Sequence, residues 1–182
     1  MRFLMCTALA ALALTACGGS GEIEADANGD GTITNSEAIA AIEKAGGDVK
    51  PLPGQYSTTI TLIEASIPGA PPEMAQMMGQ AMNRTSEHCL TPEMAERGFE
   101  DSIKKGQNEA CTIDSFSIDD GDVAMAMTCS EAEMADVSVN LNGKVTATSS
   151  DMIMAMDGTI PELGAMQMKM GFKQERTGEC PG

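Results

Sequence analysis

The residues best suited to chemistry in this 182-residue chain lie in a short acidic segment near the N-terminus. Side-chain oxygens alternate there at Asp26, Asn28 and Asp30, Gly31 follows directly, and a carboxylate returns at Glu37. Calcium takes about six to eight oxygen ligands, and carboxylates and amides spaced in this way can surround one ion. Residues 26–37 therefore form a candidate calcium-binding loop.

These twelve residues resemble the calcium loop of EF-hand proteins, in which Gly31 would permit the sharp turn. The resemblance implies the following ligands: the side chains of Asp26, Asn28 and Asp30, the carbonyl of Thr32, a water held by Thr34, and both carboxylate oxygens of Glu37. Two features depart from the family. Residues 18–25 are too short and Gly-rich for an entering helix, and no second loop follows. We therefore expect weak binding, with a Kd of about 10⁻⁴ to 10⁻³ M.

A second interpretation covers the end of the loop. Thr34 and Glu37 have the spacing of a capping box for a helix expected from residue 35 to about residue 44. A capping box does not explain the oxygens at Asp26, Asn28 and Asp30. Calcium binding is the favoured hypothesis, and an acidic linker before a capped helix is the alternative.

The first twenty residues resemble the start of a bacterial lipoprotein precursor. Arg2 precedes an apolar run that is shorter than the roughly 20 residues needed to span a bilayer, and the run ends in Leu14-Thr15-Ala16-Cys17. The resemblance implies cleavage after residue 16, acylation of Cys17 and, because Gly18 follows it, sorting to the outer membrane on the side that faces the periplasm. An ordinary cleaved signal peptide is the alternative.

The composition excludes several classes of function. The chain has 27 acidic against 11 basic residues, a net charge of −16, so it lacks the basic surface that nucleic acids require. It has one histidine, His88, which we expect to be a strand residue, and none of the common hydrolase or phosphate-binding motifs. We therefore expect a monomer that is not an enzyme.

The body of the protein is expected to begin near residue 48, where Pro51-Leu52-Pro53-Gly54 marks a boundary. The predicted organisation is a signal peptide at 1–16, a tether with the loop and a short helix at 17–47, and a β domain at 48–182. Strands are expected at 55–66, on both sides of a turn at Asp120-Gly121, and at 136–141, 144–156 and 166–175, with a turn at Asn142-Gly143. Helices are expected at 73–82 and from 92 to about 105. This pattern predicts an α+β, mainly β fold: an antiparallel meander sheet, curved or half-barrel, with one or two short helices packed on it.

After cleavage and acylation, four cysteines would form two disulfides in an oxidising compartment. These are Cys89, Cys111, Cys129 and Cys180. A two-residue turn at Asp120-Gly121, with a bulge at Asp114-Ser115, places Cys111 opposite Cys129 and all apolar side chains on one face. We therefore favour Cys111–Cys129 with Cys89–Cys180. Cys89–Cys111 with Cys129–Cys180 is the alternative.

Short motifs are distributed along this body. They are Gly54-Gln55-Tyr56 at the start of a strand, Cys89-Leu90-Thr91-Pro92-Glu93, the hairpin from Cys111 to Cys129, and Arg176-Thr177-Gly178-Glu179-Cys180. In this order and spacing they resemble the family called domain of unknown function 3617, over residues 51–182. The resemblance implies an exported, disulfide-containing, β-rich domain with no established activity.

Methionines suggest a further hypothesis. They alternate along two expected strands, as Met152, Met154 and Met156 and then as Met166, Met168 and Met170. Thioethers select Cu(I), but methionine also fills apolar cores, and strand alternation requires apolar residues here in any case. We favour core packing over Cu(I) binding. The overall prediction is a non-enzymatic, membrane-anchored envelope lipoprotein with a weak calcium site, and the alternative is a carrier or chaperone for an apolar ligand or Cu(I).

Overall fold

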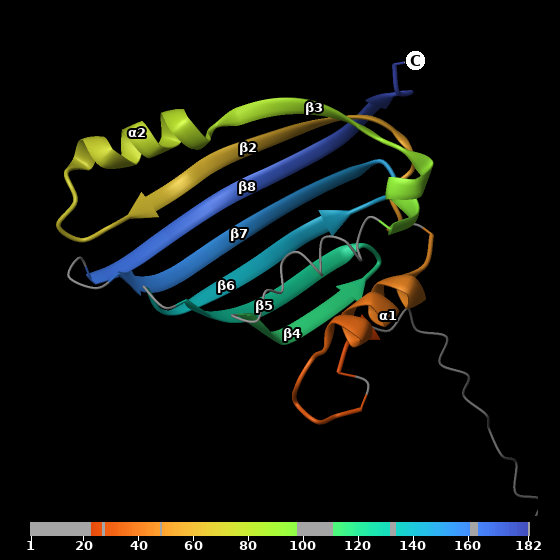
Figure 1. Ribbon diagram of the computed structural model, residues 1–182, viewed down its shortest axis with the longest axis horizontal. Helices are drawn as coiled ribbons and strands as arrows, with labels where there is room; N and C mark the ends of the chain where they lie inside the picture. Colours follow the sequence, from red (N-terminus) through yellow and green to blue (C-terminus); the bar gives the residue numbers. More distant parts are fainter. Residues whose placement is uncertain are drawn as a thin grey trace, which may run out of the picture.

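A computed structural model describes residues 23–26, 28–47, 49–97, 111–131, 134–160 and 164–181. The predicted signal peptide at 1–16 and the predicted acylation site, Cys17, lie outside these residues. Within them, the chain forms one antiparallel sheet of eight strands that is flanked by helices (Figure 1). No helix in the described ranges is long and apolar enough to cross a bilayer.

Along the chain, a short strand and a helix come first, two strands separated by a helix follow, and a run of five strands ends the chain. They are β1 (Ile23–Glu24), α1 (Asn35–Ala45), β2 (Gly54–Ser66), α2 (Pro72–Met82), β3 (Arg84–Leu90), β4 (Cys111–Asp119), β5 (Asp122–Glu131), β6 (Met134–Val145), β7 (Ser149–Ile160) and β8 (Gly164–Gly178). Residues 92–97 are also helical. This helix begins where Thr91-Pro92 predicted it, and its expected continuation to residue 105 lies outside the described residues.

Five consecutive strands form a meander, which β2 and β3 extend at one edge and β1 extends at the other. Strands β4 to β8 pair in chain order, β2 pairs with β8, and β3 and β1 form the two edges, in the order β1-β4-β5-β6-β7-β8-β2-β3. Its two edge strands do not pair with each other in the described part of the chain, so the sheet is open. The sheet is broad and curved, with α1 beside β4 and α2 beside β2 and β3 (Figure 1). The predicted mainly β, α+β fold is confirmed.

The hairpin of β4 and β5 has the register that its turn predicts. Asp120 and Gly121 adopt φ values of 46° and 80°, the left-handed pair that a tight hairpin turn needs. The register shifts between Ile113 and Ser115, which is the predicted bulge, and Cys111 then lies opposite Cys129. Ile118 pairs with Val123 as expected.

The predicted turn at Asn142-Gly143 is wrong. Strand β6 continues through both residues, and β7 begins only after a turn at residues 146–148. Thr146 builds this turn, since its hydroxyl accepts hydrogen bonds from the backbone N–H groups of Thr148 (3.3 Å) and Ser149 (3.0 Å). Gly143 is needed for another reason: a Cβ there would collide with the backbone of Asp151 and Met152 on β7.

The main buried cluster lies where α1 packs on β4. Helix α1 contributes Ala38 and Ala41, which are 1% and 4% exposed, and β4 contributes the side chains of Ile113, Phe116 and Ile118. Small residues on α1 allow the helix to approach the sheet closely. The described residues before residue 47 therefore share a core with the sheet.

Helix α2 covers the opposite end of the sheet less completely. Its four methionines, at positions 74, 77, 78 and 82, have the spacing of one helix face. Met78 and Met82 are half-buried, whereas Met74 and Met77 are 41% and 69% exposed. The helix therefore packs on β2 by one narrow side.

Candidate calcium-binding loop and methionine face

The candidate calcium loop lies between β1 and α1. Strand β1 takes the place of the entering helix of an EF-hand, and it pairs with β4 through Ile23 opposite Ile118 and Glu24 opposite Ser117. Helix α1 starts at Asn35, with Thr34 as its N-cap. Both ends of the loop are therefore attached to the same strand of the sheet, one by pairing and one by packing.

Side-chain oxygens near the start of the loop hold its backbone in successive tight turns. The carboxylate of Asp26 accepts hydrogen bonds from the N–H groups of Gly29 (2.8 Å) and Gly31 (3.0 Å). Asn28 accepts from the N–H of Asp30, and Asp30 accepts from that of Thr32, both at 2.8 Å. Gly29 and Gly31 adopt φ values of 72° and 79°, which favour glycine. These hydrogen bonds from backbone N–H groups to alternating side-chain oxygens thus fold the first half of the loop back on itself.

Glu37 makes the predicted capping box with Thr34. Its carboxylate accepts from the backbone N–H of Thr34 at 2.9 Å and from the hydroxyl at 2.8 Å, while the Thr34 hydroxyl accepts from the Glu37 N–H at 3.3 Å. Across the ranges that the structure describes, no three His, Cys, Asp or Glu side chains converge as a ready metal site. To bind calcium, Glu37 would have to turn from Thr34 toward Asp26 and Asp30, and this competition is consistent with weak affinity.

Ile33 links the loop to the sheet. It forms an antiparallel bridge with Ile113 of β4, and it is 6% exposed within the main buried cluster. In paired EF-hands the apolar residue at this position joins a second loop. Here β4 supplies the partner strand that the missing second loop would have provided. The sequence could not identify this partner, because the two isoleucines lie 80 residues apart.

Both favoured disulfides are present. Cys111–Cys129 joins opposite residues of β4 and β5, and Cys89–Cys180 joins the end of β3 to the chain just after β8. The second bond fastens the sheet at its β3 edge, where β3 pairs only with β2 among the described strands. With these four cysteines bonded, none is available as a thiolate nucleophile.

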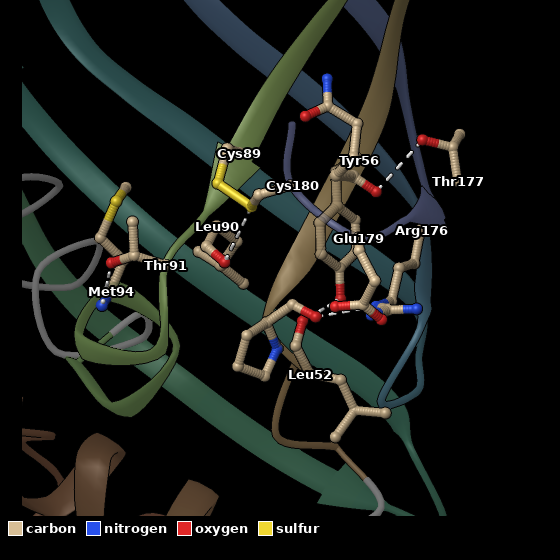
Figure 2. The surroundings of a disulfide bond; sticks show 12 residues. Leu52, Tyr56, Cys89, Leu90, Thr91, Met94, Arg176, Thr177, Glu179 and Cys180 are labelled. Carbon is tan, nitrogen blue, oxygen red and sulfur yellow. Dashed lines mark hydrogen bonds and ion pairs between the residues drawn. A yellow bond between two sulfur atoms is a disulfide. The ribbon is translucent and has the colours of Figure 1, made fainter. Parts of the chain in front are cut away.

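A polar cluster beside Cys89–Cys180 holds the ends of β2 and β8 together (Figure 2). Tyr56, which is 2% exposed, donates its hydroxyl to the carbonyl of Leu52 at 2.8 Å. Arg176 donates from Nε to the carbonyl of Pro53 at 2.8 Å and pairs with Glu179. Gly54 lies directly against Arg176, where a Cβ would collide with the guanidinium. These residues were noted as motifs, but their joint structural role was not predicted.

The remaining groups of this cluster are also structural. His88 lies on β3, as expected, where its ring stacks on Tyr56 with centroids 5.9 Å apart, and its Nε2 is 3.2 Å from the amide nitrogen of Gln174. Burial raises the pKa of the Tyr56 phenol above its ordinary value, and the charge of Arg176 partly opposes this shift. The neutral phenol is therefore the form that this cluster stabilises.

A cavity of about 590 Å³ lies between the end of α1 and the turns of the β4–β5 and β6–β7 hairpins. Ile23, Val49 and Ile118 contribute apolar surface to it. Lys144 at its edge donates to the carbonyl of Asp120 at 3.0 Å and to the carboxylate of Asp122 at 3.1 Å. These contacts fasten the hairpin turn, and no sequence motif indicated the cavity.

The two methionine strands, β7 and β8, pair antiparallel with each other. Met154 lies opposite Met170 and Met156 lies opposite Met168, but Met152 faces Phe172 and Met166 faces Gly158. Met152, Met166 and Met170 are buried, at 9%, 8% and 7% exposure, whereas Met154, Met156 and Met168 are half-buried. Two directly opposed methionine pairs therefore lie side by side on one face of the sheet.

Comparison with known proteins identifies a family and adds no activity. No curated protein and no solved structure matches the chain. The model of one family, described as "Protein of unknown function (DUF3617)", matches residues 51–180. The match covers more than half of the chain and spans both disulfides, the Tyr56 cluster and the methionine strands. The chain belongs to the DUF3617 family.

Proposed function

We propose that this protein is a non-enzymatic, lipid-anchored component of the bacterial cell envelope, in which the loop 26–37 binds calcium weakly and holds the N-terminal segment on β4. The bridge between Ile33 and Ile113 carries the proposal. A cation bound in the loop would order the chain between β1 and α1, and both of these elements rest on β4. The site would therefore act on stability, not on signalling.

The charges of the loop support a cation. Asp26, Asp30 and Glu37 place three carboxylates within twelve residues, and repulsion between like charges at short range is relieved by a divalent ion. Calcium suits this set because it accepts carboxylate, amide and carbonyl oxygens in a flexible geometry. Magnesium demands a stricter octahedral arrangement and is expected to bind less well.

The lipid anchor is proposed from the motif that ends at Cys17. Acylation there would attach the membrane six residues before Ile23, which is within roughly 20 Å of β1 even for a fully extended chain. The end of the sheet that carries α1 and β4 would then lie near the membrane surface. Incorporation of labelled fatty acid into the wild-type protein, and its loss in Cys17→Ser, would test the anchor.

Calcium binding can be tested by thermal unfolding of the lipid-free chain. With a Kd of about 10⁻⁴ to 10⁻³ M, 10 mM calcium would stabilise the fold by about 1.4 to 2.7 kcal/mol. For a chain of this size, that corresponds to a Tm increase of about 3 to 10 °C. Asp26→Ala should remove the increase, and Glu64→Ala, which removes an exposed acid on β2, should retain it. The proposal fails if calcium leaves the Tm unchanged, or if Asp26→Ala responds as the parent does.

A second candidate function is supported by the methionine face. Several of its side chains remain half-buried between α1 and α2, and flexible thioether side chains adapt to ligands of different shape. The protein could thus hold an apolar ligand or Cu(I) on this face as a carrier or chaperone. Native mass spectrometry after gentle purification would show whether a ligand accompanies the chain, and a ligand-free chain would contradict this candidate.

A further inference from the structure

Two pairs of methionines form a compact set on the face of β7 and β8. We call this set the methionine quartet; it consists of Met154, Met156, Met168 and Met170. Directly opposed side chains have Cβ atoms about 4.5 to 5.5 Å apart, and neighbours two residues along a strand are about 7 Å apart. Each thioether is carried on a flexible, unbranched chain. Four sulfur atoms can therefore converge above one point of the sheet.

The surroundings of the quartet offer no competing hard ligands in register. On β6, Leu141 lies opposite Met154 and Val139 lies opposite Met156. On β2, Leu62 lies opposite Met170 and Ala65 lies opposite Met168. An ion above the quartet would meet thioether sulfur and hydrocarbon from these strands. Such a ligand set selects soft monovalent metal over calcium, magnesium or zinc.

Position in the sheet distinguishes the quartet from the methionines of β5, which are also half-buried. Met125 and Met127 on β5 share the same face, but they pack against the main buried cluster beneath α1. The quartet is not part of that cluster, and three of its four side chains are half-buried. Packing against the main buried cluster accounts for the β5 pair, whereas the quartet lies outside that cluster and combines four sulfur atoms in two opposed pairs.

We propose that the methionine quartet binds one Cu(I) ion through its thioethers. This inference deepens the second candidate function, because it names the ligand and the residues that hold it, and it is independent of the calcium loop. Thioethers are neutral, so the bound ion would keep its single positive charge. The net charge of −16 on the chain favours the approach of such a cation.

The test is an anaerobic titration of the full chain with Cu(I) in competition with a chromophoric Cu(I) chelator. Cys6→Ala and Cys17→Ser remove the thiols that lie outside the two disulfides and would otherwise bind the ion. One Cu(I) per chain is expected, with only sulfur neighbours in X-ray absorption. The double variant Met154→Leu, Met168→Leu removes one sulfur from each pair and should weaken Cu(I) affinity by at least about 100-fold. Mutating only the partners that orient a metal's ligands typically lowers affinity by up to about 100-fold, so the loss of two ligands should reach or exceed that value.

Leucine is chosen because it keeps the apolar volume and usually costs less than about 1.5 kcal/mol. The opposite diagonal, Met156→Leu with Met170→Leu, provides a second variant if the first does not fold. Met125→Leu with Met127→Leu is the matched control and should bind as tightly as the parent, and so should Asp26→Ala. The proposal is overturned if the parent binds no Cu(I), if a folded diagonal variant binds as the parent does, or if the β5 control loses binding equally.

Discussion

Ile33 is the bulkiest buried side chain among the described residues of the N-terminal segment, 23–26 and 28–47. It is 6% exposed, and Ile33→Ala removes three carbons from the cluster of α1 and β4. At about 0.8 kcal/mol per buried carbon, with a further cost for the cavity, the free energy of unfolding should fall by about 2.5 to 4 kcal/mol. The Tm should fall by about 5 to 15 °C.

Ile63 offers a matched control for this substitution. It is the same residue type on β2, but it is 51% exposed, so Ile63→Ala should cost at most about half of the transfer term, near 1 kcal/mol. Urea unfolding of the two variants and the parent measures the difference. If Ile33→Ala is no more destabilising than Ile63→Ala, the bridge to Ile113 does not hold the segment, and the account of the loop is wrong.

Two further predictions concern the other end of the sheet. Because burial raises the pKa of Tyr56, the folded state favours the neutral phenol. The contribution of this group to the free energy of unfolding is fully present below the ordinary pKa near 10 and is lost as the pH rises above it. When unfolding is measured from pH 8 to 11, the loss of stability should be shallower in Tyr56→Phe than in the parent. Loss of Cys89–Cys180, which spans 91 residues, should destabilise the fold by about 1.4 kcal/mol more than loss of Cys111–Cys129, which spans 18. Equal urea midpoints for the two variants, each with one cysteine pair replaced by alanine, would contradict this order.

Local pattern was sufficient to predict much of the sheet. The alternation of apolar residues and the turn at Asp120-Gly121 fixed the register of β4 and β5, including the bulge and the disulfide Cys111–Cys129. The same reasoning failed at Asn142-Gly143, because these residues also suit a strand in which a neighbouring backbone passes close to glycine. The dipeptide Asn-Gly alone does not distinguish a hairpin turn from a strand position at which another backbone passes close to the glycine.

Long-range partners could not be predicted from the sequence. Nothing near Ile33 indicates that Ile113 completes its pairing, and nothing near Tyr56 indicates that Arg176 lies beside it. The alternation of the methionines predicted two strands, but the pairing of Met154 with Met170 depends on a register that only the fold determines. For the calcium loop, spacing identified the ligands, whereas the rotation required of Glu37 became visible only in its contacts with Thr34.

The central claim, that calcium in the loop holds the N-terminal segment on β4, can be tested most directly by hydrogen–deuterium exchange. The amides of residues 111–119 would be followed in the lipid-free chain at 10 mM calcium and in the presence of a calcium chelator. Because β1 and Ile33 both pair with β4, calcium should slow exchange in this strand and leave β3, at the far edge of the sheet, unchanged. Equal exchange in β4 with and without calcium would contradict the account.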